Sequence, residues 1–126
     1  MKQTSVTLLF AVSACCFSVY GTEELVVFTY NIHHAEGMDG LVDLDRIVSI
    51  IKDAGPDVVC LQEVDRGLPR TGGLDFPALL AEKLGMQAFF EPNYRFDGGE
   101  YGNALLTRLP VAGHHNQALP NPVNAE

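Results

Sequence analysis

Basic residues are scarce in this chain of 126 residues, because eight lysines and arginines face sixteen aspartates and glutamates, for a formal net charge of −8. A surface this acidic repels polyanions over long range and weakens non-specific binding to nucleic acid. The composition therefore disfavours nucleic acid as a partner and, with it, a duplex nuclease. With 47% hydrophobic and 19% charged residues, the chain is typical of one small globular domain.

Cysteine is nearly absent, and of three cysteines only Cys60 lies outside the N-terminal stretch. One cysteine cannot form an intramolecular disulfide, and Cys60 lies between valine and leucine in a strand-like run. We interpret it as a small hydrophobic core residue rather than a nucleophile. The sequence also lacks a Walker loop, a Gly-rich dinucleotide fingerprint, a paired-cysteine zinc pattern and internal repeats. The sequence therefore gives no support to the protein classes that depend on these motifs or on repeats.

Charge is missing altogether from residues 3–21, a run whose apolar centre is short for a membrane span and is typical of a secretory signal peptide. Cleavage after Gly21 would leave seven basic and sixteen acidic residues, a net charge of −9. This interpretation, which we favour, makes the protein exported, either periplasmic or extracellular. Alternatively, residues 12–15 resemble a lipobox, and cleavage before Cys15 would leave a lipoprotein anchored to the membrane. An uncleaved short anchor is a third alternative.

The rest of the chain alternates between strand and helix patterns and predicts an α/β fold. The first three elements form a strand–helix–strand unit of the size of a crossover connection, so its two strands are expected to be parallel, either adjacent or separated by a neighbour. The predicted elements are strands at about 24–32, 58–62, 87–91 and 101–107, and helices at about 43–54 and 75–85, capped by Asp43 and Asp75.

The strand that follows Pro56 ends abruptly in polar groups, which places Glu63 at its far end. In α/β proteins chemistry is usually carried at such strand ends, because the framework is rigid and the loops beyond it vary. Glu63 is thus the first candidate for a functional residue, although a solvated carboxylate would fit the same position. Polar residues also begin at Asn31, which could equally be an ordinary turn residue.

Three segments together, residues 29–33, 56–65 and 101–110, resemble the endonuclease/exonuclease/phosphatase superfamily. The resemblance covers about residues 25–112, the N-terminal half of that fold, and residues 65–73 look most like its exported bacterial members. It implies a four-layered α/β sandwich, in which two packed mixed sheets are flanked by helices. It also implies Mg²⁺-dependent hydrolysis of a phosphodiester or phosphomonoester, with Mn²⁺ as a substitute metal.

The resemblance assigns roles to individual residues. Glu63 matches the metal-binding glutamate of the family, and Asn31 matches the asparagine beside the metal and the scissile phosphate, so both are candidate catalytic and metal-binding residues. Candidate substrate-binding residues are His33, Arg66, Arg70 and Asn103. Alternatives stay open: the pair of histidines that begins at His33 could be merely exposed, and an arginine beside Asp65 could form a weak ion pair. Arg108 is expected to support its loop.

The late motifs of the family have no match here, since no Asp-x-Asn follows residue 110 and no aspartate follows Asp97. We expect the chain to be an inactive fragment of a longer hydrolase, with an apolar sheet face left uncovered. The intact protein would act as a phosphodiesterase or phosphatase on small phosphoesters or lipid headgroups. The alternative is a non-catalytic exported binding module built on the same half-fold. The sequence leaves the oligomeric state open.

Overall fold

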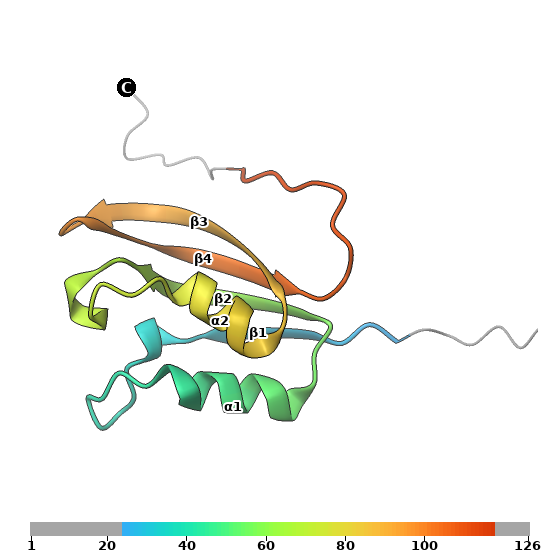
Figure 1. The fold of residues 1–126 in the computed structure, drawn as a ribbon, viewed down its shortest axis with the longest axis horizontal. Coiled ribbons are helices and arrows are strands. Elements are labelled where there is room, and N and C mark those ends of the chain that lie inside the picture. Colours follow the sequence, from blue (N-terminus) through green and yellow to red (C-terminus); the bar gives the residue numbers. More distant parts are fainter. Residues whose placement is uncertain (1–23, 118–126) are drawn as a thin grey trace, which may run out of the picture.

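The computed structural model describes residues 24–117, so both predicted signal cleavage sites, at Gly21 and before Cys15, lie outside the described residues. Strands and helices alternate along this part of the chain (Figure 1). The elements are β1 (Val27–Asn31), η1 (His33–Ala35), α1 (Leu44–Ala54), β2 (Val58–Arg66), η2 (Pro69–Thr71), α2 (Phe76–Leu84), β3 (Gln87–Phe96) and β4 (Gly99–Thr107), where η1 and η2 are single 3-10 turns.

The strands form one mixed sheet in the order β1-β2-β4-β3. β1 and β2 are parallel neighbours with Val27 opposite Val58, and α1 makes the crossover between them. The other two pairs are antiparallel, and β3 and β4 form a hairpin. The predicted α/β class and the parallel first pair are thereby confirmed.

Both α-helices begin and end where the capping residues predict. Asp43 accepts hydrogen bonds from the backbone N–H groups of Asp45 and Arg46 at 3.0 and 3.2 Å, and Asp75 accepts one from Ala78 at 3.0 Å. Each helix ends at a glycine in the left-handed conformation, which a residue without a Cβ adopts at little cost. The described part of the chain contains no helix long and apolar enough to cross a membrane.

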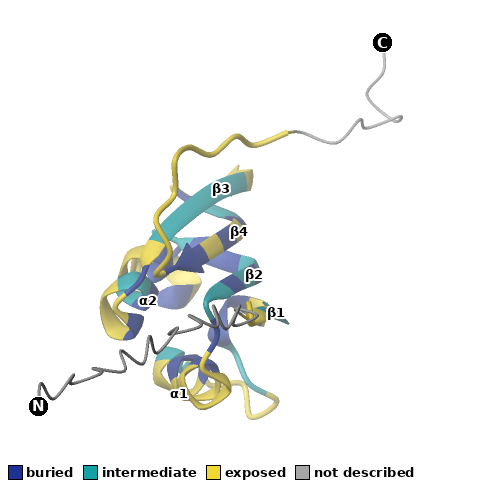
Figure 2. Cartoon of the chain, turned by 90° about the vertical axis from the view of Figure 1, so that its right-hand side faces the viewer, coloured by how far each residue is buried: buried dark blue, intermediate teal, exposed yellow. Residues whose placement is uncertain are grey.

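The helices cover one face of the sheet, and the core lies between the helices and that face (Figure 2). Ile51 of α1 and Leu80 of α2 are fully buried there against Val59, Leu61 and Leu106 of the sheet. Since side chains alternate along a strand, Cys60 points to the opposite face and is only half-buried. Cys60 thus lies outside the core of the described residues, and its predicted role in core packing stays a prediction for the intact protein.

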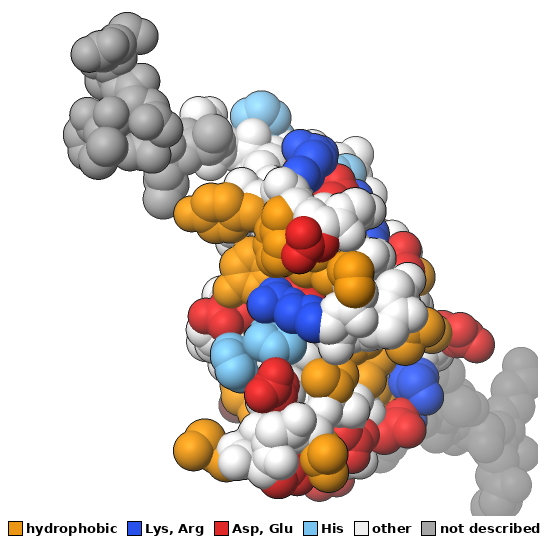
Figure 3. All heavy atoms as spheres, turned by 90° about the vertical axis from the view of Figure 1, so that its left-hand side faces the viewer, with side chains coloured by type: hydrophobic (Ala, Val, Ile, Leu, Met, Phe, Trp, Pro, Cys, Tyr) orange, Lys and Arg blue, Asp and Glu red, His pale blue; other side chains and the backbone are white. Residues whose placement is uncertain are grey.

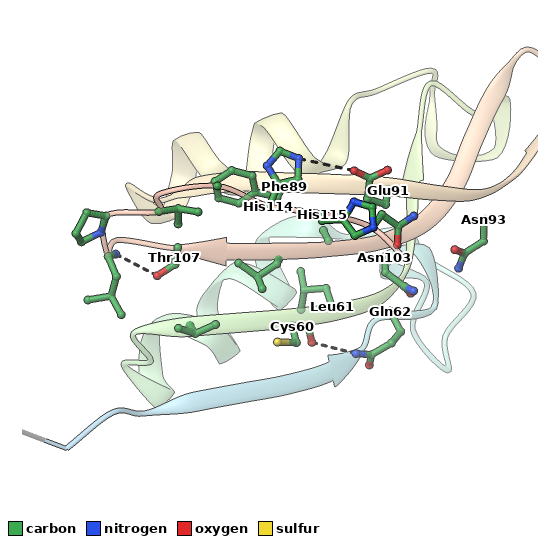
Figure 4. Close-up of a pocket in the computed structure, with 18 residues that line it drawn as sticks. Cys60, Leu61, Gln62, Phe89, Glu91, Asn93, Asn103, Thr107, His114 and His115 are labelled. Atoms are coloured by element: carbon green, nitrogen blue, oxygen red, sulfur yellow. Dashed lines mark hydrogen bonds and ion pairs between the residues drawn. The ribbon is translucent and has the colours of Figure 1, made fainter. Parts of the chain in front are cut away.

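Among residues 24–117, no helix covers the opposite face of the sheet. Leu105 is 39% exposed there, whereas its neighbours on β4, Ala104 and Leu106, are buried. The chain beyond β4 returns along this face and borders with it an open cavity of about 610 Å³ (Figure 4). Phe89, Leu105 and Val111 give the lining an apolar character.

Three strands are longer than predicted, of which β4 begins only two residues earlier, at Gly99. β3 continues through Pro92 to Phe96, because it is an edge strand in which the missing N–H of proline is tolerated, and its register with β4 shifts between Pro92 and Tyr94. β2 continues past Glu63 to Arg66. Glu63 consequently lies within a strand and not at its end.

Candidate functional site

A bulge in β2 sets the position of Glu63. Leu61 pairs with Ala104 and Val64 with Gly102, so that Gln62 and Glu63 together lie opposite the single residue Asn103. Glu63 adopts a φ of 60°, in the left-handed region that disfavours any side chain. A bulge re-aims the side chain at the extra residue. The bulge in β2 therefore sets the direction of the Glu63 carboxylate.

At the level of the bulge, β4 lies very close to β3, its neighbour on the side away from β2. A Cβ atom at Gly102 would collide with the backbone of Glu91 and Pro92 in β3, so that only glycine fits. This contact gives a structural reason for the glycine in the third segment that resembles the family.

Asn31, the last residue of β1, holds Glu63 directly. Its Nδ2 donates a hydrogen bond of 2.7 Å to Glu63 Oε1, while its Oδ1 accepts one of 3.0 Å from the backbone N–H of His33. Donation from Asn31 is the main cause that lowers the pKa of Glu63, with smaller contributions from Tyr101 and the two neighbouring histidines. Glu63 is thus ionised at neutral pH.

The turn η1 carries the histidines to the same end of the molecule. His33, His34 and Ala35 have φ values of 46°, 43° and 64°, a left-handed run of three residues without glycine, and such strain tends to gather at functional sites. The side chain of His34 is buried and lies 3.1 Å from Glu36 through its Nε2, whereas His33 is exposed. The interpretation of both histidines as merely exposed was therefore wrong for His34.

Arg70 lies next to these groups. Its Nε and Nη2 donate to the two carboxylate oxygens of Asp65 at 2.7 and 2.6 Å, and the Asp65 side chain is fully buried. This pairing raises the pKa of Arg70, and the charge of Glu36 adds to the effect. Figure 3 shows histidine side chains grouped with acidic and basic ones at this end of the molecule.

The other predicted substrate-binding residues lie elsewhere or face a different way. Arg66 pairs with Glu100 on β4 and stacks over the Phe90 ring, with its Cζ atom 4.5 Å from the ring centroid. Asn103 points from β4 into the cavity on the open face, on the same side as Gln62 (Figure 4). Arg108 donates to the carbonyl oxygens of Pro56 and Leu84 at 3.1 and 3.3 Å, so its predicted loop-supporting role is confirmed.

The cavity on the open face and the charged cluster are thus different places. Neither Asn31 nor Glu63 lines the cavity, whose walls are mostly apolar. Hydrolytic chemistry depends on ionised and polar groups more than on volume, and we therefore take the surface around Glu63 as the candidate site.

The site offers few protein ligands for a divalent cation. Among residues 24–117, no group of three or more histidine, cysteine, aspartate or glutamate side chains could hold a metal together. Mg²⁺ keeps most of its waters and needs one or two carboxylates with phosphate oxygens. Glu63 can supply one such carboxylate, since Asn31 occupies only its Oε1 oxygen.

Tyr101 belongs to this site and was not among the predicted functional residues. It lies opposite Asp65 in the register of β2 and β4, and it contributes to the lowered pKa of Glu63. The sequence signal was its place directly before Gly102-Asn103 in the third matched segment. That signal could not show an influence on Glu63, because the influence depends on strand register.

The family model described as Endonuclease/Exonuclease/phosphatase family matches residues 28–125. The chain belongs to this family. The endonuclease/exonuclease/phosphatase family is one of phosphoesterases and nucleases, and membership confirms the resemblance drawn from the three segments.

Solved structures of two family proteins are similar to this chain. The crystal structure of an endonuclease/exonuclease/phosphatase from Beutenbergia cavernae DSM 12333 has 35% identity and a TM-score of 0.60. A family protein from Leptotrichia buccalis C-1013-b has 18% identity and a TM-score of 0.55, a likeness of fold alone. Each match covers 71% of this chain, but only 27% of the first protein and 40% of the second. A comparison with curated proteins gave no match.

Proposed function

We propose that the intact protein is a metal-dependent phosphoesterase in which Glu63 binds Mg²⁺, with Mn²⁺ as a substitute. The observation that carries this proposal is the hydrogen bond of 2.7 Å between Asn31 and Glu63, because it joins residues of two family segments into one ionised, oxygen-rich site. When bound, the metal would neutralise charge on the phosphoryl oxygens and orient the group for in-line attack by water.

The residues around the carboxylate have distinct parts in this proposal. Asn31 keeps Glu63 ionised and aimed by donating to it, and carries no charge that would repel a phosphate. His33 and Arg70 are the proposed substrate-binding groups, since His33 lies near Glu63 and Arg70 near Glu36, and both offer hydrogen-bond donors. For Arg66 and Asn103 the support is weaker, as Arg66 already pairs with Glu100 and Asn103 faces the apolar cavity.

The substrate class follows from charge. The chain carries sixteen acidic and eight basic residues, which favours small phosphodiesters, phosphomonoesters or lipid headgroups over duplex nucleic acid. Export remains part of the proposal on the strength of residues 3–21, with lipidation at Cys15 as the alternative that would place the protein at a membrane.

We further propose that the open sheet face is covered in the intact protein by a second sheet, giving the four-layered sandwich. Leu105 and Phe89 contribute apolar surface to this face. The other described residues do not fully cover that surface. Such a surface is normally buried against another layer.

Replacing the carboxylate tests the function. In the intact protein, Glu63→Gln keeps the shape of the side chain and removes its charge, and we expect Mg²⁺-dependent hydrolysis of an aryl phosphodiester to fall by about 100-fold or more, the scale of losing one group that stabilises the transition state. Glu82→Gln, at an exposed position of α2, is the matched control and should change nothing.

Each outcome has a distinct meaning. Activity retained in the Glu63→Gln variant would remove Glu63 from the mechanism. Metal binding that depends on Glu63 without any hydrolysis by the intact protein would instead favour the non-catalytic binding module.

A further inference from the structure

Three aromatic side chains share one face of the β3–β4 hairpin near its turn, and we call them the aromatic strip. Tyr94 of β3 lies opposite Tyr101 of β4, and their ring centroids are 6.3 Å apart. Phe96 follows Tyr94 by two residues along the strand and therefore points to the same face. Tyr94 and Phe96 are 65% and 41% exposed, whereas Tyr101 is half-buried. The strip thus offers two accessible rings beside a third that is partly covered.

Arg70 adds a fixed positive charge to the aromatic strip. Its guanidinium carbon lies 5.6 Å from the ring centroid of Phe96 and 5.3 Å from that of Tyr101, within the range of a cation–π contact. Its Nε and Nη2 donate to the fully buried Asp65, which holds the guanidinium in place. Its Nη1 donates to none of the residues 24–117, and the side chain is 40% exposed. The strip is therefore paired with a restrained donor that an anion can reach.

The strand register places the aromatic strip beside the candidate site. Tyr101 lies opposite Asp65, which follows Glu63 by two residues in β2. A strand rises by about 3.3 Å per residue, so Tyr101 and Glu63 are about 7 Å apart along the strand direction. A small phosphoester whose phosphate lay between Glu63 and Arg70 would bring one of its ester arms against the strip.

We propose that the aromatic strip is a substrate subsite that takes a planar aromatic arm of the phosphoester, while the free Nη1 of Arg70 binds its phosphate. Aromatic rings attract one another in offset or edge-to-face contacts by more than the area they bury. The proposal rests on the proposed function, because that function places the phosphate at Glu63. The competing explanation is that the rings only stabilise the hairpin as cross-strand neighbours, in which case they recognise no ligand.

Two ligands of equal charge separate these explanations. Phenylphosphonate and cyclohexylphosphonate resist hydrolysis and differ in whether the ring is planar. By isothermal titration calorimetry of the intact protein with Mg²⁺ present, we expect phenylphosphonate to bind about 5-fold more tightly. The double variant Tyr94→Leu with Phe96→Leu keeps apolar side chains and should bind both ligands equally. Tyr94→Phe keeps the ring and should keep the preference. An unchanged affinity for cyclohexylphosphonate in both variants confirms that the site is still folded.

Equal affinities for the two ligands in the wild-type protein, or binding of neither, would overturn the subsite. A preference that survives in the double variant would overturn it as well, because the two accessible rings would then not be its source. The proposed function is measured separately, by hydrolysis of an aryl phosphodiester. Hydrolysis without any preference for the planar ring removes the subsite alone, whereas a preference without hydrolysis removes the proposed function alone.

Discussion

Asp65 is the fully buried carboxylate that ties the turn η2 to the sheet. It accepts two hydrogen bonds from Arg70 and one of 3.3 Å from the hydroxyl of Thr71. A buried charge is tolerated only when its hydrogen bonds are complete, and removing its partner costs far more than the pair contributes. The local fold at the site thus depends on a residue that is itself shielded from solvent.

Arg70→Ala should therefore destabilise the protein strongly. We expect the free energy of unfolding, measured by urea denaturation, to fall by about 2–3 kcal/mol, at the low end for a broken buried pair because the arginine is partly exposed. Arg95→Ala is the matched control, since Arg95 pairs with Glu100 at an exposed position and should cost much less. Adding Asp65→Asn to Arg70→Ala should recover part of the loss. Equal losses in the two arginine variants would contradict this account.

At the scale of the element, the bulge in β2 lowers the stability of the strand and sets the direction of the Glu63 side chain. A residue with a side chain in the left-handed region costs about 1–2 kcal/mol relative to its ordinary conformations. Glu63 occupies that region, and the hydrogen bond from Asn31 offsets part of the cost. The sequence keeps glutamate where glycine would relieve the backbone.

Substitution by glycine and by alanine should measure this strain. Both Glu63→Gly and Glu63→Ala remove the carboxylate, but only glycine is at ease with a φ of 60°, so we expect the glycine variant to be more stable by about 1 kcal/mol. At Asn103, the extended strand residue opposite the bulge, the order should reverse, with the glycine variant less stable than the alanine variant. Thermal unfolding of the four variants checks this. The same order at both positions would show that the bulge is not strained.

The helices and the bulge also differ in how far the sequence predicts them. Asp43 and Asp75 cap helices through contacts within their own turn, so local sequence was sufficient. The bulge depends on pairing with β4, a strand much later in the chain, and nothing in the run from Val58 to Gln62 indicates it. For the same reason Glu63 and Asn31 were predicted as site residues from family segments, while the influence of Tyr101 was missed.

At the scale of the whole molecule, the two faces of the sheet differ. α1 and α2 bury one face, while the other carries exposed or half-buried apolar side chains beside a largely apolar cavity. Alternation along β4 shows this directly, since Leu106 is buried under the helices and Leu105 is 39% exposed. If a second sheet packs on the open face in the intact protein, Leu105 is a core residue there.

A charge placed at Leu105 tests the proposed second layer. In the intact protein, Leu105→Glu should lower the free energy of unfolding by about 2 kcal/mol or more, because a covered face would bury an unpaired carboxylate. Ile50→Glu is the control, since Ile50 lies on the outer side of α1, has a similar exposure of 43%, and belongs to a face that no further layer is proposed to cover. Urea denaturation of both variants measures the difference. Losses of about 0.5 kcal/mol or less in both would mean that the open face remains in solvent, and the four-layered arrangement would then have to be abandoned.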